Sequence, residues 1–277
     1  MAATPLTLDE LLKLPSKEII LLAGKDGSGK SSALVSLAAF VELDTPARKF
    51  FVVDTENKLA AVLKSWGPDV PKNVVYYKCE NMNDVTEAID HIMAMVRPGD
   101  WIAVESMSRV WEKAQDLGYS AVTGLDKAVY LERRQEKIKR ENLSLKQAPP
   151  VTPRPDDLWS VVKGAHDGAF LERISQHETL NVLLTTTIAK PPRENSFRKE
   201  SQTRQDVKQE FGIDIGIEGA PRLPYYAQTL CFLDRVGGKT VCRVIRDNLT
   251  TKDDAQTTFE IPGRKMFAMA FMSECRV

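Results

Sequence analysis

The sequence has few of the residues that hold structural metal ions or disulfides. Its 277 residues include three histidines and four cysteines, and the cysteines are widely spaced with no CxxC pair. This scatter argues against a structural zinc site and favours a reducing, cytoplasmic compartment. Cys231 and Cys242 fall within apolar runs, so we expect both to be small core residues.

Net charge and long apolar runs are also missing. Lys and Arg together number 38, as do Asp and Glu, so no global charge attracts nucleic acid or a membrane, and any electrostatic site must be a local patch. No run of 18 apolar residues occurs, so we expect no membrane-spanning helix and no membrane partner. Residues 1–18 lack the basic start and apolar centre of a signal peptide.

Apolar runs and helix-like segments alternate along most of the chain. The runs typical of buried parallel strands are residues 18–24, 49–56, 73–80, 100–106 and 180–190. Helical apolar spacing follows at 30–43, 83–96 and 157–176. This pattern predicts an α/β fold with a mostly parallel central sheet and helices on both faces. Near the C-terminus, strand-like runs flank Gly237-Gly238, which predicts an antiparallel hairpin.

Two segments depart from this alternation. Residues 126–147 carry seven Lys or Arg against four Asp or Glu, and the proline-rich segment 148–155 follows, which stops a helix. We therefore expect 107–157 to be an inserted, charged helical arm outside the core. We expect 190–221 to be a flexible polar loop, within one domain that spans residues 1–277.

One motif carries recognisable chemistry. The segment "GKDGSGKS" (24–31) fits GxxxxGK[ST] at every fixed position, with a buried strand before it and a helix after it. Glycines allow successive backbone N–H groups to surround phosphate oxygens, and the helix N-terminus adds partial positive charge. The predicted nucleotide-binding residues are Gly24, Lys25, Asp26, Gly27, Ser28, Gly29, Lys30, Ser31 and Ser32.

The motif also assigns individual roles. Lys30 is expected to reach the β- and γ-phosphates of ATP, and the Ser31 hydroxyl to ligate Mg²⁺. Acids end the neighbouring strands, at the edge where open α/β sheets bind ligands. Among them, Glu105 is the candidate second metal-site residue, and Glu56 the candidate that orients or deprotonates the attacking water. The alternative is that such acids cap the following helices, and for Asp54 the two interpretations are evenly balanced.

Several segments resemble RecA-like P-loop ATPases, over most of residues 15–250 but not over the 107–157 arm. "FVVDTENKLA" (51–60) resembles the family segment whose glutamate, here Glu56, activates water. "WIAVESMSRV" (101–110) resembles the family's Walker B strand, with Glu105 where an Asp is usual. "NVLLTTTIAK" (181–190) resembles the strand that senses the γ-phosphate, with Thr186 or Thr187, preferably Thr187, where Gln is frequent.

The closing segment 221–248 is similar to that of phage-encoded RecA-like ATPases of single-strand annealing and recombination. The resemblance implies that a basic residue of this hairpin reaches the neighbouring subunit's nucleotide, here Arg246 in preference to Arg243, and hence a homo-oligomer. A basic residue that merely faces solvent is the alternative for both.

The resemblance further implies that single-stranded DNA runs along the loops after the fourth and fifth strands. The candidate DNA-binding residues of the later loop are Lys190, Arg193, Arg198, Lys199 and Arg204, with Phe197 to stack on a base. Those of the arm are Arg133, Arg134, Lys137, Lys139 and Arg140. The alternatives are a solvated helix and a mobile loop, or an arm that packs on a neighbouring subunit.

The sequence thus indicates a RecA-like, Mg²⁺- and ATP-dependent ATPase that acts on single-stranded DNA in recombination, annealing or replication. A nucleotide-gated assembly protein with little hydrolysis is the main alternative, because Glu105 and the threonines depart from the family pattern. A small-molecule kinase is disfavoured, because no lid-like arginine cluster is present and the chain closes with a hairpin.

Overall fold

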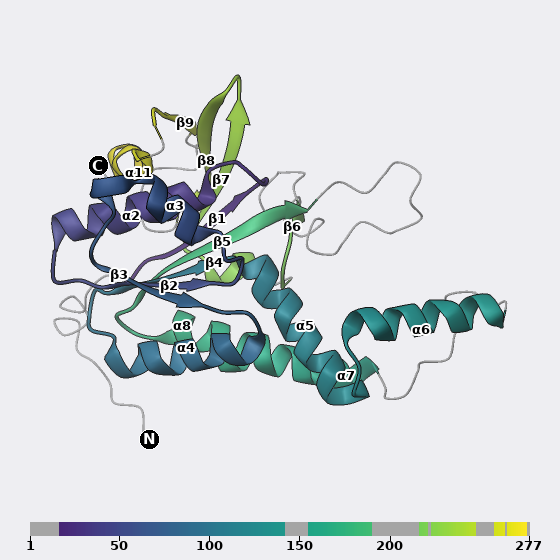
Figure 1. The fold of residues 1–277 in the computed structure, drawn as a ribbon. Coiled ribbons are helices and arrows are strands. Elements are labelled where there is room, and N and C mark those ends of the chain that lie inside the picture. The colour runs from purple at the N-terminus through teal and green to yellow at the C-terminus, as the bar shows by residue number, and fades with distance from the viewer. Residues whose placement is uncertain are drawn as a thin grey trace.

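The structure is a computed structural model that describes residues 17–141, 155–189, 216–220, 223–247, 258–263 and 265–275. Its strands are β1 (Ile19–Gly24), β2 (Phe50–Asp54), β3 (Val74–Lys78), β4 (Trp101–Glu105), β5 (Asn181–Ala189), β6 (Gly216–Ile217), β7 (Thr229–Val236), β8 (Lys239–Asp247) and β9 (Thr258–Ile261). They form one sheet in the order β3-β2-β4-β5-β1-β7-β8-β9, with β6 paired to β5 (Figure 1).

The sheet is parallel from β3 to β7 and antiparallel from β7 to β9. Every residue of β1, β2 and β4 is buried, as expected for parallel strands covered on both faces. The β7–β8 hairpin turns at Gly237 and Gly238, which both have positive φ (59° and 83°), as a two-residue hairpin turn requires. The predicted α/β class, the mostly parallel sheet and the hairpin are confirmed.

Helices cover both faces of the sheet (Figure 1). On one face lie α2 (Lys30–Asp44), α3 (Leu59–Ser65) and α11 (Phe267–Cys275). On the other lie α4 (Met82–Met95), α5 (Met107–Thr123), α7 (Pro155–Lys163) and α8 (Glu172–Gln176). A π-helix, η2 (Gly164–Leu171), joins α7 to α8, and the short elements are η1 (Gly67–Asp69) and α10 (Leu223–Tyr226).

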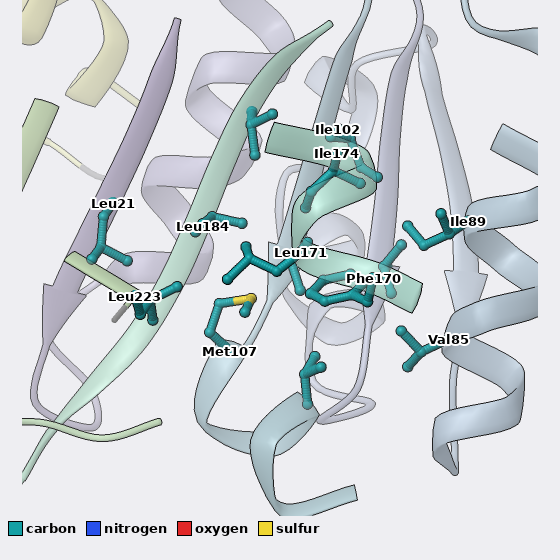
Figure 2. Close-up of a cluster of buried hydrophobic side chains, with 14 of the residues drawn as sticks. Leu21, Val85, Ile89, Ile102, Met107, Phe170, Leu171, Ile174, Leu184 and Leu223 are labelled. Atoms are coloured by element: carbon teal, nitrogen blue, oxygen red, sulfur yellow. The ribbon is translucent and has the colours of Figure 1, made fainter. Parts of the chain in front are cut away.

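Each face of the sheet has its own apolar core. Under α2 and α11, the rings of Phe50 and Trp101 stack with centroids 6.1 Å apart. On the opposite face, Figure 2 shows Phe170 and Leu171 at the centre of a buried cluster, between Ile89 and Leu184. Packing of this kind fixes the carboxyl ends of the parallel strands, where the site lies.

The segment 107–157 differs from the expected arm. Met107, Val110 and Ala114 of α5 are buried in the core, so α5 belongs to the body of the fold. Their spacing is that of a helical stripe, which the many charged residues around it obscured. An arm-like element begins only with α6 (Lys127–Arg140), which has no buried residue and projects from the body (Figure 1).

Only part of the expected 190–221 loop is described. Within it, β6 pairs with β5 antiparallel and so extends the sheet locally. None of the helices in the described ranges has the length and apolar character needed to cross a bilayer.

Candidate nucleotide-binding site

The glycine-rich loop joins β1 to α2. Gly27 and Gly29 have φ values of 76° and 102°, a region that residues with a Cβ rarely adopt. Gly24 is required for a different reason, because an added Cβ would lie 2.3 Å from Ser28 Oγ and 2.7 Å from the backbone oxygen of Leu233. The loop therefore keeps backbone N–H groups close to the start of α2, as a phosphate-binding loop needs.

Lys30 is the first residue of α2 and is buried. Its Nζ donates hydrogen bonds to the backbone oxygens of Gly24 (2.7 Å) and Lys25 (3.0 Å), which place the ammonium over the loop. Burial lowers the pKa of Lys30, and the charge of Glu105 partly offsets this effect. The first turn of α2 has no side-chain cap and no acidic residue, so its partial positive charge is available to an anion.

Glu105 connects the loop to the sheet. Ser31 Oγ donates to Glu105 Oε1 (2.9 Å), and Thr185 Oγ1 donates to Glu105 Oε2 (2.8 Å). The residue is 3% exposed, and burial raises its pKa to about 7 against these two hydrogen bonds. The structure therefore brings together Ser31 and Glu105, as the sequence predicted. Thr185 was not predicted, and its only sequence signal is a threonine run that interrupts an apolar strand.

Asp54 shapes the loop that follows β2. This buried carboxylate accepts hydrogen bonds from the backbone N–H groups of Glu56 and Asn57 (both 2.9 Å) and of Leu59 (3.0 Å), and from the Tyr76 hydroxyl (2.8 Å). Leu59 begins α3. Asp54 thus caps the first N–H of α3, the role considered as the alternative, and its hydrogen bond to the Glu56 N–H holds the backbone at that residue.

Two side chains hold the carboxylate of Glu56. Ser106 Oγ donates to Oε1 (2.7 Å), and Lys58 Nζ pairs with Oε2 (2.8 Å). Burial opposes ionisation, but the hydrogen bonds from Lys58 and Ser106 outweigh it and lower the pKa of Glu56. The group is therefore an ionised carboxylate at neutral pH, which a proton acceptor must be. Neither Lys58 nor Ser106 was predicted from the sequence.

Two cavities flank this arrangement and share Asp26, Glu56 and Lys58. The first, of about 410 Å³, contains the start of α2, Glu105 and the C-terminal part of the sheet. Its further lining residues are Gly27, Gly29, Lys30, Ser31, Ser32, Ala33, Val62, Arg235, Thr240, Ile261, Gly263 and Phe267. The second, of about 450 Å³, is also lined by Lys25, Ser108, Arg109, Glu112, Thr187, Ile188 and Glu218. Arg235 was not predicted.

The residues present fit Mg²⁺ and a nucleotide phosphate. Ser31 and Glu105 supply hydroxyl and carboxylate oxygens, the ligands that Mg²⁺ prefers. Mg²⁺ bound with phosphates needs only one or two protein ligands, and the described residues hold no cluster of three His, Cys, Asp or Glu suited to a metal ion. Ser28 Oγ is buried with no partner in the structure and adds a polar group to the loop.

The predicted sensor lies beside the loop. Thr187 is the register partner of Gly24, and its backbone N–H donates to Ser108 Oγ (3.1 Å). Thr186 instead donates from its hydroxyl to the backbone oxygen of Glu218 (2.6 Å), which leaves Thr187 as the threonine that lines the second cavity.

Other predicted residues lie elsewhere. Arg246 is in β8 opposite Leu230, but its side chain is outside the described part, and Arg243 is exposed on the same strand. The DNA-binding candidates Lys190, Arg193, Arg198, Lys199 and Arg204, with Phe197, fall outside the described residues.

Comparison of the chain with models of known protein families finds no match. Comparison with curated proteins finds no relative either.

Proposed function

We propose that the protein is a Mg²⁺-dependent ATPase with a RecA-like core, which acts on single-stranded DNA in recombination, annealing or replication. The observation that carries the ATPase proposal is the convergence of Lys30, Ser31, Glu105 and Glu56 on one cavity at the glycine-rich loop. Ser31 and Glu105 supply oxygen ligands, and Glu56 is kept ionised by Lys58 and Ser106.

Each residue has a defined task in hydrolysis. Backbone N–H groups of the loop and the N-terminus of α2 bind the phosphates, and the Lys30 ammonium offsets their negative charge. Ser31 and Glu105 would hold Mg²⁺, which when bound stabilises charge on the phosphate oxygens. Glu56, kept ionised by Lys58 and Ser106, orients a water for in-line attack and accepts its proton.

The strand order of the sheet supports the proposed RecA-like core. β5, which carries Thr185 and Thr187, lies between β1 and β4. It therefore contacts both the glycine-rich loop and Glu105, as the sensor strand of the resembling family would. The strand order and the hairpin are compatible with that family. We further propose a homo-oligomer in which Arg246 reaches the neighbouring subunit's phosphates.

A second candidate function is a nucleotide-gated assembly protein with little hydrolysis. The observation that favours it is Glu105, whose pKa of about 7 leaves the carboxyl partly protonated near neutral pH. A protonated carboxyl is a poor Mg²⁺ ligand, so nucleotide would bind and order an assembly while turnover stays slow.

Steady-state ATP hydrolysis with and without oligo(dT) tests the proposal. Lys30→Ala removes the phosphate-binding ammonium and should lower kcat by about 10²- to 10³-fold. Lys64→Ala, an exposed position on α3, is the matched control and should hydrolyse like wild type. Equal rates in wild type and Lys30→Ala would reject the ATPase. ATP-dependent sedimentation without turnover would then identify the assembly protein.

A further inference from the structure

Four aromatic rings form a line from the core to the surface beside α5. Phe170 lies 6.2 Å from His166, His166 meets Trp111 edge-on at 5.0 Å, and Trp111 stacks on Trp159 at 6.0 Å with planes 15° apart. We call Phe170, His166, Trp111 and Trp159 the aromatic ladder. Its inner rings, Phe170 and His166, are fully buried, whereas Trp159 is 41% exposed.

The inner end of the ladder is held firmly. The π-helix η2 carries both His166 and Phe170, and His166 Nδ1 is 2.7 Å from Asp167 Oδ1. Close approach of α5 and α7 is possible because Gly118 has no side chain, since a Cβ there would lie 2.6 Å from Val162. The buried ring of His166 thus holds Trp111 in place, and Trp111 covers one face of the Trp159 ring.

The same side of α5 also anchors the cationic helix α6. Trp111, Gln115 and Tyr119 are spaced four residues apart, so they share one face of α5. Lys127 Nζ donates to Gln115 Oε1 (2.6 Å), and the rings of Tyr119 and Tyr130 are 5.0 Å apart. Along this face, the aromatic ladder is therefore followed directly by the start of α6.

α6 adds positive charge to this surface. Its 14 residues include six Lys or Arg against two Glu, and none of them is buried. Proteins that bind single-stranded nucleic acids combine cations with exposed aromatic rings. The cations contact the phosphates, and each base can stack on a ring. A second copy of this surface is disfavoured as a partner, because its like charge would repel.

We propose that the outer face of Trp159 stacks on bases of single-stranded DNA while the cations of α6 contact its phosphates. This inference rests on the proposed function and assigns the DNA contact to described residues outside the later loop. None of the four ladder residues lines the two cavities at the nucleotide site. The ladder is therefore a surface separate from the nucleotide site.

Tryptophan emission titrated with oligo(dT) tests this assignment. Trp66 and Trp101 are buried (5% and 7% exposed), so they give a constant background, and quenching reports on the ladder. Trp159→Ala should lose most of the quenching and weaken affinity, measured by anisotropy of labelled oligo(dT), about tenfold or more. Trp159→Phe should keep most of the affinity because a stacking ring remains. Tyr225→Ala, an exposed aromatic position on α10, should bind like wild type.

A charge variant provides a second readout without touching the core. Arg133→Glu/Lys137→Glu lies on α6, which has no buried residue. It should reduce the slope of log affinity against log salt by about 1.4, since each single-strand phosphate contact contributes about 0.7. Circular dichroism of all variants reports whether the fold is kept.

The outcomes separate the two proposals. If wild type does not bind oligo(dT), the DNA part of the proposed function fails, and this inference fails with it. If wild type binds while Trp159→Ala and the α6 charge variant bind equally well, the ladder is not the site and the proposed function stands. A tryptophan signal that follows protein concentration and ignores oligo(dT) would assign the surface to self-association and overturn the inference.

Discussion

Ser31 Oγ donates a 2.9 Å hydrogen bond to Glu105 Oε1, which ties the first turn of α2 to the end of β4. Thr185 engages the other carboxylate oxygen from β5. These hydrogen bonds favour the ionised carboxylate, yet burial outweighs them and raises the pKa of Glu105 to about 7. The proposed second Mg²⁺ ligand thus changes its own charge near neutral pH.

This shift predicts how stability depends on pH. The folded-state pKa of Glu105 lies above the ordinary value of 4.5, so between about pH 4.5 and 7 the folded protein holds a proton that the unfolded chain has released. The free energy of unfolding should therefore fall as pH rises through this window, by up to about 3 kcal/mol, and this contribution levels off above it.

Urea unfolding of wild type and Glu105→Gln, both in EDTA, measures this contribution. Glu105→Gln cannot titrate at this position, so the difference in free energy of unfolding between the two proteins should change between pH 5 and 8. Parallel pH curves would show that Glu105 titrates normally.

The glycine-rich loop makes a sharper prediction about binding. Gly24→Ala places a methyl group 2.7 Å from a backbone oxygen of β7, which cannot move as a side chain can. We expect the loop to distort and the affinity for a fluorescent ATP analogue to fall by at least about tenfold, the equivalent of 1.4 kcal/mol. Gly164→Ala, with nothing within 4 Å of the added Cβ, is the matched control. Unchanged binding by Gly24→Ala would show that the loop tolerates the methyl group.

Features that contiguous residues encode could be predicted from the sequence. The glycine-rich loop was predictable because strand, turn and helix are contiguous, and β4 because an apolar run ends in Glu105. The hydrogen-bond partners of Glu105 and Glu56 were not predictable, because Thr185 is 80 residues from Glu105 and Ser106 is 50 residues from Glu56. Only the parallel strand order brings those hydroxyls to the carboxylates.

Two further differences have local causes. Asp54 and Glu56 are both acids at the end of one strand, and the sequence favoured Glu56 for the attacking water but left Asp54 evenly balanced between the site and a helix cap. The structure separates their roles by turning Asp54 inward, where four donors occupy its oxygens. In α5, the buried stripe of Met107, Val110 and Ala114 was masked by the charges that surround it.

Asp54 should therefore act on catalysis through position and not through contact with nucleotide. In Asp54→Asn, an amide group replaces one acceptor and faces backbone N–H donors, which should lower the free energy of unfolding by about 1–3 kcal/mol. We expect kcat for ATP to fall, since Glu56 loses its support, while affinity for the ATP analogue stays near that of wild type. Asp44→Asn, at an exposed position at the end of α2, controls for charge. Loss of nucleotide affinity in parallel with kcat would contradict a positioning role.

Lys58 gives the most direct test of the proton-accepting role of Glu56. Its ammonium, 2.8 Å from Glu56 Oε2, lowers the pKa of that carboxylate, so Lys58→Met should raise it. Since Glu56 must be ionised to accept a proton, the acid limb of the kcat profile should move to higher pH. Lys58→Arg keeps the cation and should restore the wild-type profile, and Lys64→Met controls for lost charge on the adjacent helix α3. A variant that lowers kcat equally at all pH values would show that Lys58 acts on structure alone, whereas a displaced acid limb identifies Glu56 as the group that titrates in turnover.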